Sequence, residues 1–314
     1  MFSIAYATDN GYAQHVAVSL YSLYKSARKP DEFQVFILDN NLSEDHRQKL
    51  KETAGWFGRE LHFIDISDIA SRLPAGTDTA NLSISTYCRL FVAQLLPSDI
   101  DLLLYLDCDT YINDDITDIV NFLPPSAGWY VAGVEDTMYP SMKEVIGLKR
   151  TDLYLNAGIL LINLKRWRDE NIVGRFIQFI EKYHGSVPHL DQGVINGVFR
   201  QGKVRLPLRY NVQAPIFAIH RYRDLVNYYS LPAFYDARTV GEAIHNPAIV
   251  HFTSFFLERP WFSFCLHPLK DLYRHALRQT PYAQSPLQAN RSGRVNMFKD
   301  LCFKYFQPLY LWIR

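Results

Sequence analysis

Residues 102–112 read LLLYLDCDTYI, an apolar run that ends in two aspartates, Asp107 and Asp109. The length and composition of this run predict a buried β-strand. A buried carboxylate without a partner is costly, so two carboxylates at a strand end indicate either a bound cation or an open edge of a sheet. Which of these applies depends on what surrounds the strand.

Short apolar runs alternate with helical patterns before this stretch. The apolar runs cover residues 2–8, 34–39, 61–66 and 101–107. The helical patterns cover residues 10–29, 43–57 and 84–97, and Ser43 is placed to cap the second of them. Such alternation predicts an α/β fold with a doubly wound, largely parallel sheet, which binds ligands where its strands end. Four aspartates lie at or near these ends: Asp9, Asp39, Asp65 and Asp107.

After residue 112 the alternation is less regular. Strand-like runs cover residues 129–136, 154–168 and 248–252, and helical patterns cover residues 171–184, 189–202 and 268–280. Residues 279–293 are rich in Ser, Gln, Pro and Asn, a composition typical of a linker. We therefore expect one domain over residues 1–262 and a helical C-terminal region over residues 263–314.

The C-terminal part of the chain is basic, although the net charge of all 314 residues is only +1. Residues 259–314 contain nine Lys or Arg and two Asp, a charge of +7, which leaves −6 for the rest of the chain. Within residues 291–314 the basic residues alternate with aromatic ones, a composition typical of attachment to an anionic membrane surface. The alternative is a helix packed on the domain. No recognition motif favours nucleic acid as a partner.

Four cysteines are scattered along the chain without a CxxC pair or zinc-ligand spacing, which favours a reducing compartment. The first residues lack the basic segment and apolar core of a signal peptide, and no run of about 18 apolar residues predicts a transmembrane helix. Together with the basic tail, these features predict a cytoplasmic protein that binds peripherally to the inner face of the cell membrane.

The aspartate pair has three interpretations. Asp107 and Asp109 can bind a divalent cation that in turn holds a diphosphate, and Mg²⁺ and Mn²⁺ both have suitable ligand preferences. They can belong to a phosphatase of the haloacid dehalogenase type, although Thr110 comes one place too early for that motif and the chain has no Gly-Asp dipeptide. They can also be solvated turn residues, and the motif alone does not decide.

Six separated blocks of sequence favour the metal site. They are YATDNGYA (6–13), ISTYCRL (84–90), LYLDCDT (104–110), YLNAGILLINLKRWR (154–168), HLDQGVING (189–197) and VHFTSFFLERPW (250–261). In this order the blocks resemble glycosyltransferase family 8, the retaining transferases of the GT-A fold, over residues 3–262, with the bacterial lipopolysaccharide galactosyl- and glucosyltransferases as the most similar branch. The resemblance implies a Rossmann-like, mixed but mainly parallel sheet with flanking helices and a small helical C-terminal appendage.

The resemblance also implies a donor site with a metal ion. Asp107, Asp109 and His251 match the metal ligands, usually of Mn²⁺ with Mg²⁺ as the alternative, and the ion neutralises the diphosphate of a UDP-hexose. Other positions match residues that contact the nucleoside, the sugar or the phosphates: Ala7, Thr8, Asp9, Asn10, Tyr12, Arg89, Cys108, Asn156, Ala157, Gly158, Asp191 and Gln192. Asp136 is a further candidate for contact with the sugar or the acceptor, and Ser254 and Arg259 are candidates for contact with the phosphates. Arg259 stands where the family has Lys, and Ser254 lies in a longer loop where the family has Gly.

Asp191 and Gln192 match the catalytic pair of the family. A double displacement needs a carboxylate nucleophile under the anomeric carbon, but Gln192 offers an amide at that position. Retention then fits front-side attack, in which the acceptor hydroxyl enters on the side from which UDP leaves. A phosphate oxygen takes the proton, and Gln192 steadies the positive centre electrostatically. Asp191 as the nucleophile remains open.

These features predict a metal-dependent retaining hexosyltransferase. It would move galactose or glucose from a UDP-sugar to a saccharide acceptor of the lipopolysaccharide or lipooligosaccharide type, which is lipid-linked. A second hypothesis within the class is a UDP-GlcNAc-type donor with a protein-glycan or wall-polymer acceptor. Outside the class, the hypotheses are the phosphatase and a non-catalytic subunit that binds nucleotide sugars.

Overall fold

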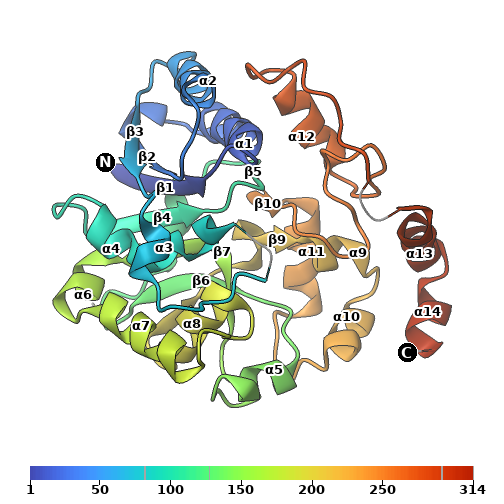
Figure 1. The fold of residues 1–314 in the computed structure, drawn as a ribbon. Coiled ribbons are helices and arrows are strands. Elements are labelled where there is room, and N and C mark those ends of the chain that lie inside the picture. The colour runs from blue at the N-terminus through green and yellow to red at the C-terminus, as the bar shows by residue number, and fades with distance from the viewer. Residues whose placement is uncertain (81–82, 127, 291–292, 314) are drawn as a thin grey trace.

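The protein is an α/β structure built around one large mixed sheet (Figure 1). The computed structural model describes residues 1–80, 83–126, 128–290 and 293–313. The large sheet has the strand order β3-β2-β1-β4-β7-β6-β8. Its strands are β1 (Phe2–Thr8), β2 (Phe33–Asp39), β3 (Leu61–Asp65), β4 (Leu102–Leu106), β6 (Val131–Glu135), β7 (Leu155–Asn163) and β8 (Lys203–Arg205). A small sheet has the order β5-β10-β9, with β5 (Thr110–Ile112), β9 (Val212–Gln213) and β10 (Ile249–His251).

The strand order reverses between β1 and β4, and this position determines where a ligand can enter. β1 pairs in parallel with β2 on one side and with β4 on the other, and only β7 runs antiparallel to its neighbours in the large sheet. The loops that follow β1 and β4 diverge at such a switch point and leave a crevice. The prediction of an α/β fold with a mainly parallel sheet is confirmed.

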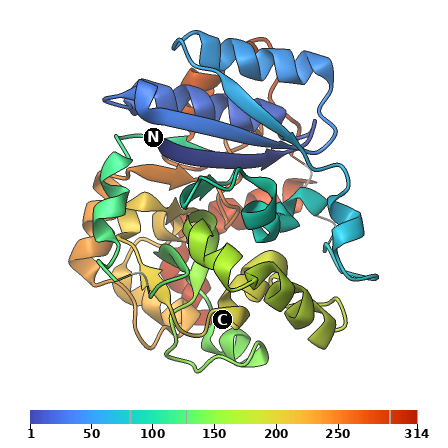
Figure 2. The same ribbon diagram turned by 90° about the vertical axis from the view of Figure 1, so that its left-hand side faces the viewer.

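Helices cover both faces of the large sheet. Alternate residues of one strand enter different cores: Ile4 and Tyr6 face the first core, while Ala5 and Ala7 face the second. The first core is covered by α1 (Ala13–Ser26), α2 (Glu44–Gly55) and α12 (Lys270–Leu277). The second core is covered by the 3₁₀ helix η2 (Ile84–Phe91), α4 (Val92–Leu95), α6 (Leu164–Asp169), α7 (Ile172–Lys182) and α8 (Leu190–Val198). The turned view shows the blue N-terminal layer stacked over the green and yellow middle of the chain (Figure 2).

Short helices complete the chain around these layers. They are α3 (Ile69–Arg72), α5 (Pro140–Val145), α9 (Ala214–Ala218), α10 (Tyr222–Tyr229), α11 (Ala237–His245), α13 (Gly293–Tyr305), α14 (Gln307–Ile313) and the 3₁₀ turns η1 (Pro30–Glu32), η3 (Thr117–Phe122) and η4 (Leu208–Tyr210). Among the described residues, no helix combines the length and the apolar composition that crossing a bilayer requires.

One predicted helix is confirmed and one predicted strand is too long. The helical prediction for residues 84–97 holds over a 3₁₀ helix, Ile84–Phe91, followed by one α-helical turn, Val92–Leu95. The strand expected over residues 154–168 stops at Asn163, where α6 begins. The Asn163 side chain accepts a hydrogen bond from the Arg166 amide at 3.0 Å, so it caps the helix. Ser43 caps α2 as predicted, accepting from the His46 amide.

The stretch expected to be a linker is packed against the domain. Tyr282 is buried and its hydroxyl lies 2.7 Å from His46 Nδ1 on α2. The Gln288 amide donates to the Trp261 carbonyl at 2.8 Å. The polar composition of residues 279–293 hides these two anchors. The predicted division at residues 262 and 263 stays a prediction, but residues 263–290 share buried contacts with the first part of the chain.

Helix α13 also contacts the rest of the protein. Phe303 is 1% exposed, and the Gln307 side chain after it bonds the Ala218 carbonyl and the His220 amide. On α13, three apolar or aromatic side chains are exposed, those of Phe298, Leu301 and Tyr305, and Phe306, which follows the helix, is exposed as well. Four residues of the predicted basic and aromatic tail are not assigned to either face of the helix. Arg291 and Arg314 lie outside the described residues, as do the side chains of Arg294 and Trp312.

Candidate active site

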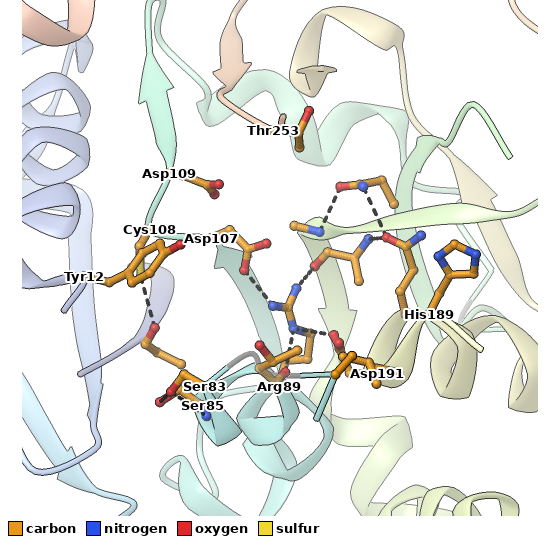
Figure 3. A pocket seen from close by; sticks show the side chains of 18 of the residues that line it. Tyr12, Ser83, Ser85, Arg89, Asp107, Cys108, Asp109, His189, Asp191 and Thr253 are labelled. Atoms are coloured by element: carbon orange, nitrogen blue, oxygen red, sulfur yellow. Dashed lines mark hydrogen bonds and ion pairs between the residues drawn. The ribbon is translucent and has the colours of Figure 1, made fainter. Parts of the chain in front are cut away.

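A cavity of about 940 Å³ opens at the switch point between β1 and β4. Fifteen of the residues proposed from the sequence line it: Ala7, Thr8, Asp9, Tyr12, Arg89, Asp107, Cys108, Asp109, Asn156, Ala157, Gly158, Asp191, Gln192, His251 and Arg259. Figure 3 shows Tyr12, Asp107 and Asp109 on one side of this cavity, Arg89 at its centre, and Asp191 and His189 on the other side.

Asp107, Asp109 and His251 form a three-residue cluster on the cavity wall. Strand β10 pairs antiparallel with β5, and this pairing places His251 opposite Thr110. As a result, His251 Nε2 lies 3.1 Å from Asp109 Oδ1 and 3.9 Å from Asp107 Oδ2. One ligand atom from each of the three residues falls within 4.8 Å of the others. Two carboxylates and one imidazole make a donor set suited to a divalent cation such as Mn²⁺.

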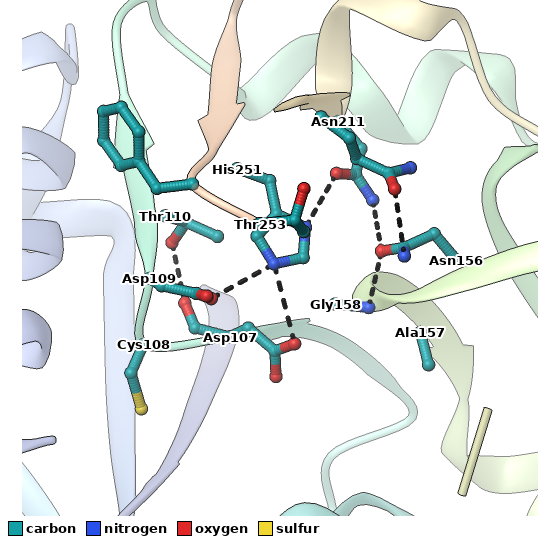
Figure 4. A network of polar contacts seen from close by, with 12 residues as sticks. Asp107, Cys108, Asp109, Thr110, Asn156, Ala157, Gly158, Asn211, His251 and Thr253 are labelled. Carbon is teal, nitrogen blue, oxygen red and sulfur yellow. Dashed lines mark hydrogen bonds and ion pairs between the residues drawn. The ribbon is translucent and has the colours of Figure 1, made fainter. Parts of the chain in front are cut away.

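A chain of hydrogen bonds fixes how the His251 ring is turned (Figure 4). The Gly158 amide donates to Asn156 Oδ1 at 3.0 Å, and Asn211 Nδ2 donates to the same oxygen at 2.8 Å. Asn211 therefore presents its Oδ1 to His251 Nδ1, 3.1 Å away, so Nδ1 carries the proton. His251 Nε2 then faces the two aspartates and donates to Asp109 Oδ1, 3.1 Å away; a metal ion bound there would replace this proton and use the Nε2 lone pair.

Because Gly158 has no side chain, His251 and Asp107 can occupy the space beside it. A Cβ at position 158 would lie 2.9 Å from both His251 Nδ1 and Asp107 Oδ2, closer than real Cβ atoms approach other groups. The glycine of the Asn-Ala-Gly block is therefore needed for the close approach of β7 to the cluster. The residues present fit a divalent ion in donor chemistry, in orientation and in space.

The three groups of the cluster have shifted pKa values. Burial raises the pKa of the Asp107 carboxyl, and the Arg89 guanidinium only partly offsets this. Burial acts in the same direction on Asp109, but His251 and Arg259 lower the pKa of that carboxyl to about 2. Burial lowers the pKa of His251, yet the Asp109 carboxylate raises it above its ordinary value. The carboxylates thus attract positive charge to this point, and a cation bound by the same atoms would replace the proton.

Arg89 joins the two halves of the site. Its side chain is 6% exposed, with Nη2 2.7 Å from Asp107 Oδ1 and Nε 2.9 Å from Asp191 Oδ2. Nη1 donates to the Ala157 carbonyl, and the guanidinium lies 4.5 Å from the centre of the Tyr105 ring. These contacts occupy the guanidinium with protein groups, so its contact with a donor sugar stays a prediction. In this structure Arg89 sets the positions of two carboxylates.

A strained turn positions Asp191 and Gln192 at the start of α8. His189 and Leu190 have φ values of 60° and 54°, a left-handed conformation that costs a non-glycine residue roughly 1 kcal/mol or more. Gly193 follows, and a Cβ there would overlap the Pro188 carbonyl oxygen. Asp191 is 4% exposed, and burial raises the pKa of its carboxyl to about 6 although Arg89 lowers it.

The Gln192 amide is held by three partners. Its Oε1 accepts from the Ala157 amide at 3.0 Å and from Asn156 Nδ2 at 3.2 Å, and its Nε2 donates to Asp136 Oδ2 at 2.9 Å. Asp136 does not line the cavity itself. It lies behind Gln192 and Asn156, where it accepts from both amides. The sequence placed Asp136 near sugar or acceptor, and the structure adds that it orients two lining side chains.

Four of the five loop residues expected to contact the nucleoside line the cavity, and the fifth does not. Ala7, Thr8, Asp9 and Tyr12 line the cavity. Asn10 does not, because its side chain donates to the Asn41 carbonyl at 2.9 Å and accepts from the Ser43 amide at 2.8 Å. It ties the loop to the start of α2.

Residues 252–259 form the loop that carries Arg259. Arg259 Nη2 lies 3.7 Å from Asp109 Oδ2, so the guanidinium reaches the cluster of Asp107, Asp109 and His251. Ser254 is exposed and does not line the cavity, whereas Thr253 does. In the same loop Phe256 has a φ of 47° and stacks on Phe303 of α13, with ring centroids 4.0 Å apart and planes 6° apart. Helix α13 thus supports the loop between two proposed donor-site residues.

Sequence reasoning missed several residues of the site. Asn211 belongs to no recognised block, and its role depends on β9 lying beside β10. Tyr105 belongs to strand β4, which was predicted, but only the three-dimensional structure shows that its ring lies under the Arg89 guanidinium. Further lining residues come from two segments that approach each other through the Asp78 amide and the Gly185 carbonyl: Asp78, Ala80, Ser83, Ser85, Thr86, Ser186, Val187, Pro188, His189 and Leu190.

Comparisons with known proteins agree with this geometry. The sequence pattern described as glycosyl transferase family 8 matches residues 3–265. General stress protein A of Bacillus subtilis (strain 168) is 26% identical over 283 residues, which cover 89% of this chain and 94% of that protein. Lipopolysaccharide 1,3-galactosyltransferase of Salmonella typhimurium (strain LT2) is 28% identical over 297 residues, which cover 91% of this chain and 80% of that protein.

One solved structure shows the same fold. The crystal structure of galactosyltransferase LgtC in complex with donor and acceptor sugar analogues matches with a TM-score of 0.71. The match has 23% sequence identity and covers 94% of this chain and 100% of that chain. At this identity the likeness concerns the fold, and it confirms the predicted GT-A architecture.

Proposed function

The chain belongs to glycosyltransferase family 8, and from that membership we propose that it is a metal-dependent retaining hexosyltransferase. Its donor is a UDP-sugar that carries galactose or glucose. Its acceptor is a lipid-linked saccharide of the lipopolysaccharide or lipooligosaccharide type. The names of relatives such as the lipopolysaccharide 1,3-galactosyltransferase support the acceptor class.

The observation that carries this proposal is the cluster of Asp107, Asp109 and His251 in the cavity at the switch point. Mn²⁺ held by these three residues, with Mg²⁺ as the alternative, would neutralise the donor diphosphate and stabilise UDP as it leaves. Arg259 Nη2 lies 3.7 Å from Asp109 Oδ2, which supports a role for its guanidinium in binding the same phosphates.

The remaining side chains orient the sugar. Gln192 and Asn156 present amide groups that are fixed by Asp136 and by backbone groups, so they reorganise little when charge develops at the anomeric carbon. Asp191 is ion-paired with Arg89, which makes it a less available nucleophile. We therefore favour front-side attack, in which the acceptor hydroxyl bonds to the anomeric carbon as the bond to UDP breaks. A phosphate oxygen of the leaving UDP takes the hydroxyl proton.

The exposed face of α13 supports the proposed location at a membrane. Phe298 and Tyr305 are 67% and 66% exposed and lie seven residues apart, on one side of the helix. Lys299 is exposed beside them. Aromatic and basic side chains together favour the surface of an anionic bilayer. The proposed location is the cytoplasmic face of the cell membrane.

A screen of UDP-sugars for metal-dependent release of UDP tests the proposal. We expect release from UDP-galactose or UDP-glucose with Mn²⁺, loss of release in EDTA, and at least about a hundredfold loss in Asp109→Ala because metal stabilisation is worth several kcal/mol. Asp169→Ala, which removes an exposed carboxylate of α6, is the matched control.

The same screen separates the competing hypotheses. Release only from UDP-GlcNAc would identify that donor class. Hydrolysis of p-nitrophenyl phosphate without action on UDP-sugars would indicate the phosphatase. Binding of UDP without turnover of any donor would indicate a non-catalytic subunit.

A further inference from the structure

A second cavity, of about 740 Å³, lies outside the donor cavity between α5, α10 and α14. Figure 1 shows these three helices on the same side of the molecule. We propose that this cavity binds an anionic group, a phosphate or carboxylate, on the saccharide acceptor. The inference rests on the proposed function and adds a substrate subsite to it.

The charge of the cavity favours an anion. Arg221 and Arg223 both line it, and Asp224 is the one carboxylate among its lining residues in the described chain. Arg221 Nε lies 3.7 Å from Asp224 Oδ2, so that carboxylate is already engaged. Arg223 is an exposed residue of α10, and its side chain forms neither an ion pair nor a hydrogen bond with any other described residue. A guanidinium that lines a cavity without a protein partner is available to bind phosphate or carboxylate through two parallel hydrogen bonds.

The other walls of the cavity suit a sugar. Tyr139 is 38% exposed, and its ring centroid lies 5.1 Å from that of Tyr229 and 6.2 Å from that of Tyr228. Aromatic rings of this kind present an apolar face that can cover the C–H face of a pyranose. Asn227 and Ser230 add polar groups that can bond hydroxyls. This mixture favours an anionic saccharide over a free inorganic anion.

A short loop connects this cavity to the donor cavity. Asp136, which bonds Gln192, and Tyr139 are three residues apart, so their Cα atoms are at most about 11 Å from each other. The buried Tyr229 packs its ring against Tyr139, with centroids 5.1 Å apart, at the end of this loop. Asp136 borders the donor cavity through Gln192, and Tyr139 lines the second cavity, so the two cavities are neighbours along this loop. In the proposal a short oligosaccharide bridges them, with its charged end in the second cavity and its other end toward the anomeric carbon of the donor.

The far side of the cavity leads toward the proposed membrane surface. Pro308 and Leu311 of α14 line it, and α14 directly follows the helix with the exposed aromatic face. An acceptor that is anchored in a membrane and carries its charge near the lipid would enter from this side. From the membrane surface inward, the acceptor would then meet helix α13, the anion subsite and the donor cavity in that order.

The test compares a phosphorylated disaccharide with its neutral parent as acceptors, in the presence of UDP-galactose and Mn²⁺. We expect kcat/KM to be at least tenfold higher for the phosphorylated acceptor in the unchanged protein. The double variant Arg221→Gln/Arg223→Gln should treat both acceptors alike, and its release of UDP without acceptor should be unchanged. Arg238→Gln, whose side chain is 87% exposed on α11, is the matched control and should keep the preference.

Two further measurements keep the outcomes distinct. Calorimetric binding of the phosphorylated disaccharide should persist in Asp109→Ala, so the subsite is testable even if no donor is turned over and the proposed function fails. Binding to vesicles of phosphatidylglycerol should be equal in the double variant and the unchanged protein. Equal use of both disaccharides, or a preference that survives in the double variant, would overturn the proposal. Loss of vesicle binding in the double variant without a preference for the phosphorylated sugar would assign the cavity to a lipid headgroup and would also overturn it.

Discussion

Replacing Gly158 by alanine is the sharpest test of the metal site, because it adds one methyl group and removes no ligand. Gly158 lies in β7 with an ordinary φ, so alanine suits its backbone. The added Cβ would lie 2.9 Å from both His251 Nδ1 and Asp107 Oδ2, whereas ordinary contact begins at 3.4 Å. The Asp107 carboxylate must therefore retreat by about 0.5 Å, the difference between these two distances, and the His251 ring must retreat further because its Cε1 is the atom nearest to the added Cβ.

This retreat is larger than a metal site tolerates. Metal–ligand distances hold to within about 0.2 Å, so at least one of the three ligands is lost. His251 cannot simply turn away, since Asn211 holds its Nδ1 on the other side. We expect Mn²⁺ affinity to fall at least about a hundredfold, or about 2.8 kcal/mol of binding free energy, and turnover to fall with it.

The measurement is a Mn²⁺ titration followed by electron paramagnetic resonance, with thermal unfolding of the same samples without metal. Gly241→Ala is the matched control, because a Cβ there meets nothing within 4 Å. Its α11 position should gain stability of up to about 1 kcal/mol from helix propensity, with unchanged Mn²⁺ binding. A Gly158→Ala protein that binds Mn²⁺ within twofold of the unchanged protein would refute the assignment of the cluster.

Three further predictions concern residues around the site. Asn211→Ala should weaken Mn²⁺ binding by roughly 10- to 100-fold in the same titration, because His251 loses the partner that orients it. Phe303→Ala should lower the free energy of unfolding by about 3–5 kcal/mol and raise the KM for the UDP-sugar, whereas Phe298→Ala should change only vesicle binding. Burial lowers the pKa of His267 to about 3, so between pH 6.5 and 3 this histidine binds a proton in the unfolded state but not in the folded state. Stability is therefore lost as the pH falls, and His267→Phe should reduce the loss between pH 7 and 5.5 by about 1 kcal/mol in urea titrations.

Each of these has an outcome that contradicts it. Unchanged Mn²⁺ affinity in Asn211→Ala would mean that the ring is oriented by different contacts. A Phe303→Ala protein with normal stability and normal KM would mean that α13 does not support the loop. Identical pH dependence with and without the His267 side chain would mean that the folded protein accepts this proton.

The sequence predicts those parts of the site that lie on strand ends. Asp107 directly follows the apolar run of β4, at the end of a parallel strand where ligands of such sheets bind. His251 was matched to the same site only by the family resemblance, and the antiparallel pairing of β5 with β10 brings it there. Asn10 also lies at a strand end, but its side chain forms hydrogen bonds with the backbone of Asn41 and Ser43 instead of facing the cavity. The sequence does not show that these two residues lie beside Asn10 in the fold. Asn211 is the reverse case, since nothing local marks it and only the pairing of β9 with β10 reveals it.

The C-terminal segment was predicted less well for a physical reason. Its composition is basic and aromatic, which describes the exposed face of α13, but composition does not show which side chains are covered. Phe303 and Gln307 are buried: Phe303 stacks on Phe256, and Gln307 donates to the Ala218 carbonyl. Removal of residues 294–314 would therefore expose part of the core, whereas the composition alone suggested that an appendage would be lost.

The pairing of β5 with β10 also determines when the site can form during synthesis. Asp109 and His251 are 142 residues apart, and chains grow at about 5–20 residues per second, so the histidine follows the aspartates by on the order of ten seconds. Until then the nascent chain carries two neighbouring carboxylates without their third partner. Once β10 has joined, an ion bound by all three residues would fasten early and late parts of the chain together. The supply of metal in the cell would then influence how much of the newly made protein stays folded, in addition to its activity.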